Sequence, residues 1–237
     1  MKHRPFLLLS LFAITWSIDN IKASAEPSGS SLAPYWSASL QAETDNNYGE
    51  AITRVAAYQQ RGGDKYLAIL RTGWLNYLNQ NYTKAAASYS GASQLQPIAI
   101  TPLLGLLSVA QAQNDAFKIQ GAADAVLKVE PSNYKAQMAL AGMYYTKKDY
   151  RKALSSYRRI LTFYPEDIDA TSGEAWCSFY LDNPQQALRG FEKILSVNPS
   201  YPYAQDGLDL LAGKPPKNTP QNGGDQKPGD PASANSP

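Results

Sequence analysis

Residues 67–97 read LAILRTGWLNYLNQNYTKAAASYSGASQLQP, and this stretch decides the fold. It begins with an apolar segment of helical periodicity, residues 67–79, followed by a polar turn at Gln80 and Asn81. A second amphipathic segment, residues 82–95, then leads to Pro97. Because proline cannot continue a helix and favours an extended conformation in the residue before it, the stretch predicts two helices closed by a corner.

The same plan recurs along the chain at a constant interval of 34 residues, which we call the repeat period. The closing proline returns as Pro97, Pro131, Pro165 and Pro199. Two columns at the same interval stay small or apolar: Ala85, Ile119, Ala153 and Ala187, and then Tyr89, Ala123, Tyr157 and Phe191. Small residues let neighbouring helices approach closely, and aromatic residues fill the space beyond. The repeat period therefore predicts a stack of helical hairpins.

This pattern resembles the tetratricopeptide repeat (TPR) family, in which two helices share each repeat with an A-x3-F motif and a closing proline. The matching motifs are Ala85-x3-Tyr89 with Pro97, Ala153-x3-Tyr157 with Pro165, and Ala187-x3-Phe191 with Pro199. The resemblance covers about residues 32 to 201. It implies an all-α fold, a right-handed α-solenoid of about five helical hairpins. The third copy has Ile119 and Ala123 in the motif, so we expect a less regular hairpin there.

Both ends of the array differ from the repeat pattern. The first copy has Gly63 in place of the closing proline and Pro34 within its opening helix, and we interpret it as an N-terminal cap. After the last repeat, Ala204, Leu208 and Leu211 share one helical face. This spacing predicts the capping helix that a solenoid needs to cover its last hairpin. We therefore predict that the solenoid with its capping helix occupies residues 32–212.

The N-terminal residues 1–25 predict a cleavable signal peptide, with an uncleaved anchor or a buried core helix as the alternatives. Lys2 and Arg4 precede an apolar run, residues 6–18, and residues 23–25 read Ala-Ser-Ala, a pattern that signal peptidase accepts. Thirteen helical residues span about 20 Å, less than a hydrocarbon core of roughly 30 Å. A flexible leader, residues 26–31, follows. We expect an exported protein, periplasmic or extracellular and possibly attached to the envelope, without a transmembrane segment after cleavage.

The C-terminal residues 213–237 are rich in proline and glycine and contain no aromatic residue. Such a composition cannot bury enough apolar surface to fold. We therefore predict a disordered tail, and the alternative is a docking peptide.

Composition and charge exclude several classes of function. The chain has 22 Lys and Arg against 20 Asp and Glu, a net charge of +2, which is too small for a general nucleic-acid binder. The single histidine is His3, so Ser-His-Asp catalysis and zinc sites built on histidine lack their central residue. No phosphate-binding glycine motif occurs. We predict no catalytic residue, no cofactor and no metal.

The single cysteine, Cys177, cannot form an internal disulfide. Two interpretations remain: a packed apolar residue within a helix, or a reactive thiol. Its apolar neighbours favour packing.

The family resemblance also implies a binding surface, because the first helix of each hairpin lines the concave side of such arrays. The helical spacing then selects the groove residues Leu70, Trp74, Tyr77, Gln111, Met138, Tyr145, Trp176 and Phe179. This groove would be aromatic and nearly uncharged. Lys135 is its only comparable cation, which disfavours a clamp for a partner's carboxylate.

These features predict a non-catalytic scaffold or adaptor in the periplasm or cell envelope that binds a protein or peptide partner. One alternative is a chaperone-like or carbohydrate-contacting envelope module that uses the same aromatic residues. A less favoured alternative is an enzyme that depends on carboxylates. For Trp74 and Trp176, the alternative to an exposed recognition surface is packing in the core between neighbouring helices.

Overall fold

The computed structural model describes residues 31–215. They form eleven helices and no strand: α1 (Ala33–Thr44), α2 (Tyr48–Gln60), α3 (Lys65–Leu78), α4 (Tyr82–Leu95), α5 (Ile100–Ala112), α6 (Ala116–Val129), α7 (Tyr134–Thr146), α8 (Tyr150–Phe163), α9 (Ile168–Tyr180), α10 (Pro184–Val197) and α11 (Pro202–Leu211). The predicted signal peptide, nearly all of the leader and most of the predicted tail lie outside the described residues. None of these eleven helices is long and apolar enough to cross a membrane.

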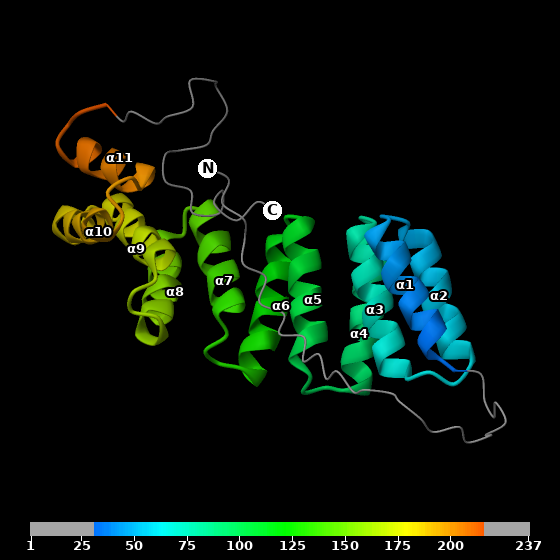
Figure 1. Ribbon diagram of the computed structural model, residues 1–237. Coiled ribbons are helices and arrows are strands. Elements are labelled where there is room, and N and C mark those ends of the chain that lie inside the picture. Colours follow the sequence, from blue (N-terminus) through cyan, green and yellow to red (C-terminus); the bar gives the residue numbers. More distant parts are fainter. Residues whose placement is uncertain (1–30, 216–237) are drawn as a thin grey trace, which may run out of the picture. The chain divides into compact units, whose positions relative to one another are not determined.

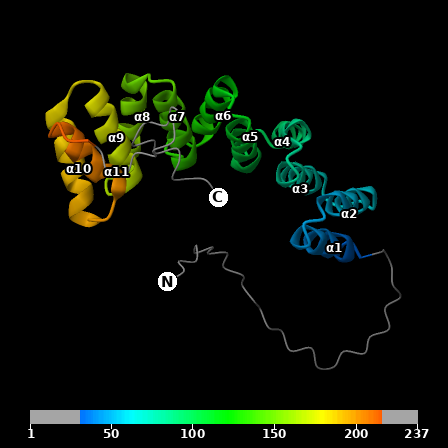
Figure 2. The same ribbon diagram turned by 90° about the horizontal axis from the view of Figure 1, so that it is seen from above.

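The helices pack as pairs in chain order, as Figure 1 shows. Each second helix packs on the first helix of its own pair and on the first helix of the next pair. In Figure 2, α1, α3, α5 and α7 form one layer, and α2, α4, α6 and α8 form the other. The last helix, α11, packs on α10 and α9. This arrangement confirms the predicted all-α solenoid of five hairpins and a capping helix.

The turn inside each pair repeats with the period of the sequence. Its central residue has a positive φ, between 49° and 60°, in all five pairs: Asn46, Gln80, Asn114, Lys148 and Asp182. Asparagine and aspartate tolerate this left-handed conformation better than other non-glycine residues do. Three of the five turns use one of these two residues, and Gln80 and Lys148 adopt the same geometry in the others.

The corners between the pairs form where the prolines predict them. The residue before each proline ends a second helix and is extended, with φ between −131° and −135°: Gln96, Glu130, Tyr164 and Asn198. The ring of a following proline disfavours the helical conformation in the residue before it. The four prolines therefore fix where each pair ends.

Close packing between successive pairs depends on a column of small residues. A Cβ atom on Gly173 would lie 2.3 Å from Cζ of Tyr157, and one on Gly207 would lie 2.4 Å from Cε2 of Phe191. A Cβ atom on Gly105 would likewise lie 2.6 Å from Cε1 of Tyr89. Real Cβ atoms do not approach other heavy atoms this closely. The aromatic column of one repeat thus occupies the space that a missing side chain leaves on the next.

The third pair departs from this rule on both sides of the contact. Ala123 replaces the aromatic residue, and Ala139 replaces the facing glycine, one repeat period before Gly173. Both alanines are buried in one core cluster. The helices α5 and α6 have 13 and 14 residues, like their counterparts in the other pairs. The expectation of a less regular third hairpin is therefore wrong, because a methyl group on the facing helix takes up part of the space of the missing ring.

The first pair is a complete hairpin. Pro34 lies in the first turn of α1, where a backbone N–H has no helical partner to lose. Ala51 and Val55 of α2 form a small core with Ala68 and Leu75 of α3. The first pair therefore closes the N-terminal end of the array by packing on α3.

Candidate functional site

The structure places the eight predicted groove residues in three different environments. Trp74 and Gln111 are exposed, Leu70, Tyr77, Met138 and Phe179 are half-buried, and Tyr145 and Trp176 are buried. The first helices therefore do not offer one continuous aromatic surface. The environments of the two tryptophans differ most.

Trp176 belongs to the core of the C-terminal repeats. Its side chain is fully buried, and its ring lies 5.1 Å from Phe191 and 5.7 Å from Phe179 between ring centroids. Its Nε1–H has no hydrogen-bond partner among the described residues. The prediction that Trp176 lines a groove is wrong for this structure, because the edge-on ring of Phe191 packs against it. The alternative of core packing holds.

Tyr145 is a second correction to the predicted groove. Its ring is buried between Tyr150 and Tyr180, at centroid distances of 5.5 and 6.1 Å. Burial raises the pKa of the Tyr145 hydroxyl far above its usual value. Met138 and Phe179 pack against the same core cluster. These positions on α7 and α9 stabilise the array and leave little side-chain surface for a partner.

Trp74 on α3 is different, because it is exposed and yet held in place. Its side chain is 43% exposed. The indole Nε1–H donates a hydrogen bond of 2.7 Å to Oε1 of Glu43 on α1. The ring is stacked on Tyr77 at 5.9 Å, with 20° between the planes. The indole therefore presents its carbon surface to solvent in a fixed orientation.

Glu43 is the residue that organises this part of the surface. Its second oxygen, Oε2, lies 2.8 Å from a guanidinium nitrogen of Arg71, whose side chain is nearly buried. The Nε–H of Arg71 donates to Oγ of Ser39 at 2.9 Å, and the guanidinium lies over the ring of Trp36 at 5.4 Å. The carboxylate thus connects α1 to α3 and neutralises the cation of α3 that lies closest to Trp74 in the sequence.

The two helices that carry Trp74 and Glu43 also carry exposed and half-buried apolar side chains. Leu40 of α1 is 47% exposed and Leu67 of α3 is 45% exposed, while Leu70 and Tyr77 are half-buried. We call Leu40, Leu67, Leu70, Trp74 and Tyr77 the Trp74 face. Exposed leucines alone are ordinary, but several beside a fixed tryptophan are typical of a binding surface.

Sequence reasoning missed Glu43 and Leu40, although the period contains the signal for both. Glu43 precedes Tyr77 by one repeat period, and Leu40 precedes Trp74 by the same interval. Extending the predicted groove by one repeat toward the N-terminus would have found them. The hydrogen bond from Trp74 to Glu43 has no such signal, because it depends on how α1 and α3 approach each other.

Cys177 and the acidic residues provide no sign of another site. Cys177 is buried, and burial together with the nearby Glu174 raises the pKa of its thiol to about 12. Within the described part of the chain, no group of three or more His, Cys, Asp and Glu side chains is arranged to hold a metal ion. Packing is therefore the role of Cys177 in this structure.

Comparisons with known proteins support the fold. A tetratricopeptide repeat family model matches residues 120–168. A tetratricopeptide repeat protein from Parabacteroides merdae is 18% identical, with 77% of this chain and 74% of that chain covered and a TM-score of 0.66. MamA from Desulfovibrio magneticus is 15% identical over 72% of this chain and 96% of that one, with a TM-score of 0.61.

YrrB, a TPR protein described as having an unusual peptide-binding site, is 14% identical over 76% of this chain and 93% of that chain, with a TM-score of 0.61. No curated protein matches the chain. At these identities the structural matches establish the fold and leave the partner of this chain open.

Proposed function

Because the described chain is an array of tetratricopeptide repeats, we propose that it is a protein-interaction scaffold whose Trp74 face binds an apolar segment of a protein or peptide partner. The observation that carries this proposal is the state of Trp74, which is exposed although its polar atom is already satisfied by Glu43. A tryptophan that served only the core would be covered, as Trp176 is.

The fixed orientation of Trp74 favours binding. A partner does not have to order this side chain, because the hydrogen bond to Glu43 and the stacking on Tyr77 already do so. Tryptophan and tyrosine are also the residue types that most often dominate the binding energy of protein interfaces. The Trp74 face therefore has the rigid aromatic anchor that a recognition surface needs.

The chemistry of the Trp74 face selects an apolar partner. Leu40 and Leu67 are exposed on the same two helices, and the cation of α3 closest to Trp74 in the sequence, Arg71, is already paired with Glu43. The partner segment would place aliphatic or aromatic side chains on the indole and leucines. The peptide-binding site described for YrrB makes a peptide segment the first class of partner to test.

We also propose that the protein works outside the cytoplasm, in the periplasm or cell envelope. The support is the sequence of residues 1–25, which has the charged start, apolar run and small-residue end of an export signal.

The test is a selection of peptides from a random displayed library on the folded chain, followed by fluorescence-anisotropy titration of the enriched peptides. We expect apolar sequences to be enriched. The variant Trp74→Ala should weaken their binding by about 30-fold, which corresponds to a hot-spot contribution of roughly 2 kcal/mol. Its circular-dichroism spectrum should stay unchanged, because Trp74 belongs to none of the core clusters of the described residues.

Phe117→Ala is the matched control, because Phe117 is an exposed aromatic residue on the second helix α6 and lies outside the Trp74 face. It should leave peptide affinity unchanged. Equal affinity of the wild-type chain and Trp74→Ala for every enriched peptide would contradict the proposal, as would loss of binding in both variants alike.

A further inference from the structure

Positive charge is concentrated on the second helices of the last four repeats. The helices α4, α6, α8 and α10 contain nine Lys and Arg residues and two carboxylates. The first helices of the same repeats contain three cations and two carboxylates. The small net charge of the whole chain therefore conceals an excess of positive charge on the second helices of these repeats.

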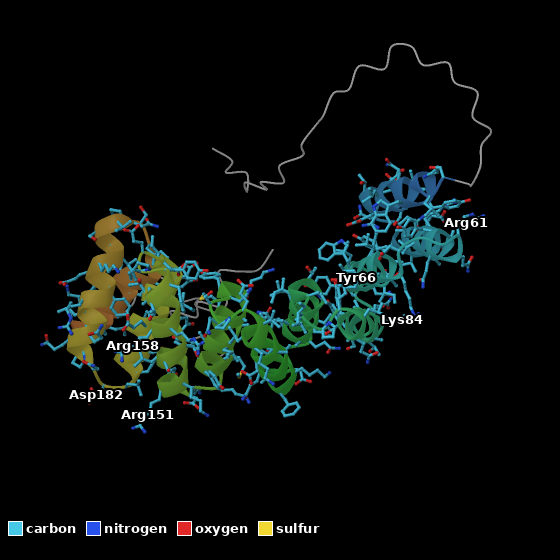
Figure 3. The ribbon with its side chains drawn as sticks, turned by 90° about the horizontal axis from the view of Figure 1, so that it is seen from below. Arg61, Tyr66, Lys84, Arg151, Arg158 and Asp182 are labelled. Atoms are coloured by element: carbon cyan, nitrogen blue, oxygen red, sulfur yellow. The ribbon has the colours of Figure 1, made fainter. Side chains whose placement is uncertain are left out.

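All nine cations are exposed, and we call them the basic face: Lys84, Lys118, Lys128, Arg151, Lys152, Arg158, Arg159, Arg189 and Lys193. The second helices form one layer of the array in Figure 2. Figure 3 shows that Lys84 and Arg151, which are two repeats apart, project from the same side of the helices. All nine cations thus belong to helices of one layer of the array.

Few of these charges are compensated. Lys118 lies 3.2 Å from Asp115, Lys152 lies 3.0 Å from Asp149, and Arg158 lies 2.9 Å from Glu174. The other six form no ion pair within the described part of the chain. Exposed pairs of this kind are weak and readily exchanged for another anion. The basic face therefore retains most of its charge for a partner.

A phenylalanine lies at the start of α6, next to Lys118. Phe117 is 88% exposed, more than any other large apolar side chain of the described residues. It belongs to α6, one of the second helices, and it precedes Arg151 by one repeat period. Exposed cations with an exposed aromatic residue among them form the combination that binds the surface of anionic bilayers.

We propose that the basic face docks on an anionic lipid bilayer and that Phe117 enters the headgroup region. The cations are spread over four helices of one layer, and each of these helices packs on first helices and not on the next second helix. A bilayer supplies phosphates at every point of such an area without a fixed register. Among the aromatic residues of these four helices only Phe117 and Phe163 are exposed, too few for the stacking platform that binds nucleotide bases.

This inference goes beyond the proposed scaffold function, because it concerns the other layer of the array. The Trp74 face lies on the first helices α1 and α3, so docking through the second helices would leave it accessible. The bilayer would then hold the scaffold while the Trp74 face binds its partner.

The test is co-sedimentation of the full chain with vesicles of phosphatidylcholine alone or with phosphatidylglycerol added. The apolar residues 6–18 can bind both kinds of vesicle, so binding to phosphatidylcholine is the baseline for every variant. We expect phosphatidylglycerol to increase binding above it. The double variant Lys84→Glu with Arg151→Glu should reduce that increase at least tenfold, because each basic residue contributes about fivefold to such binding.

The matched control is Lys65→Glu with Lys135→Glu. It changes the net charge by the same amount as the double variant of the basic face. Like Lys84 and Arg151, Lys65 and Lys135 are exposed and lie in the first turn of a helix, where glutamate is well tolerated. The control should keep the wild-type response to phosphatidylglycerol. Phe117→Ala should weaken binding several-fold, and about 1 M salt should abolish the phosphatidylglycerol dependence, since it shortens the Debye length to about 3 Å.

Three results would overturn the assignment. The first is equal binding to both kinds of vesicle, and the second is an equal loss in the face variant and its control. The third is binding to polyglutamate or duplex DNA without binding to phosphatidylglycerol vesicles, which would identify a polyanion in solution as the partner. None of these readouts depends on the Trp74 face, so the outcome is independent of the proposed peptide binding.

Discussion

The contact between Gly173 and Tyr157 gives the sharpest test of how the repeats pack. The substitution Gly173→Ala adds one methyl group to a buried position in α9. In an isolated helix the change is favourable by about 1 kcal/mol, because alanine has the higher helix propensity. In this structure the new Cβ would lie 2.3 Å from Cζ and 2.4 Å from Cε1 of the Tyr157 ring. We therefore expect the substitution to be unfavourable.

The magnitude follows from these two opposing effects. Carbon atoms in contact sit about 3.5–4.0 Å apart, so the fully buried Tyr157 ring would have to move by roughly 1 Å or more. Overpacking of a core costs about 1–3 kcal/mol, and this displacement belongs at the upper end of that range. After the gain in helix propensity, the net loss of unfolding free energy is about 2 kcal/mol. For a chain of this size, that lowers the melting temperature by roughly 4–8 °C.

The assay is thermal and urea unfolding followed by circular dichroism. Gly121→Ala is the control, because Gly121 lies within α6 and a Cβ there would meet no atom within 4 Å. It should stabilise the protein by about 0.5–1 kcal/mol. In a Tyr157→Ala background, Gly173→Ala should also become stabilising by about 1 kcal/mol, because the ring that it meets is gone.

The natural pair Ala123 and Ala139 already shows this combination of small residues. If Gly173→Ala stabilised the wild-type chain as much as it stabilises the Tyr157→Ala background, the aromatic ring would not be what requires glycine at this position. The explanation of the glycine column would then be refuted.

Four further predictions concern single residues. Trp176→Ala should cost about 3–5 kcal/mol of unfolding free energy, measured by urea titration, because it empties a buried site. Cys177 should react with a thiol reagent at pH 8 only in denaturant, because the thiol is buried and its pKa is raised to about 12; rapid reaction of the native chain would contradict this. Burial, assisted by Asp167, raises the pKa of Asp169, so the folded state holds this proton more tightly than the unfolded state and ionisation lowers stability as the pH rises. Asp169→Asn should therefore be more stabilising at pH 7 than at pH 3, and an equal effect at both would contradict the assignment. Gln80→Gly should stabilise the chain by about 1 kcal/mol in thermal unfolding, because Gln80 has a φ of 58°.

The sequence alone was sufficient for those features that depend on local chemistry. Pro131 and Pro165 end their helices wherever they occur, because the ring restricts the preceding residue. The columns spaced by the repeat period identified the core positions, including Tyr157 and Phe191, because a repeated hairpin buries the same position each time. The irregular third hairpin was expected wrongly, since the compensation at Ala139 lies on a different helix from Ala123.

The candidate site required the tertiary structure. Trp74 and Trp176 stand in the same column, three periods apart, and their spacing predicts the same role for both. The structure buries Trp176 against Phe191 and leaves Trp74 exposed beside Glu43. The burial of a side chain depends on what the neighbouring helices bring against it.

The distribution of charge also depends on the fold. A count of 22 cations and 20 carboxylates predicts a nearly neutral protein. Counted by helix, the last four repeats have nine cations on their second helices and three on their first helices. These helices pack into separate layers, as Figure 2 shows. The repeat period thus determined the fold, and the contacts between helices decided which surfaces of that fold are available to a partner.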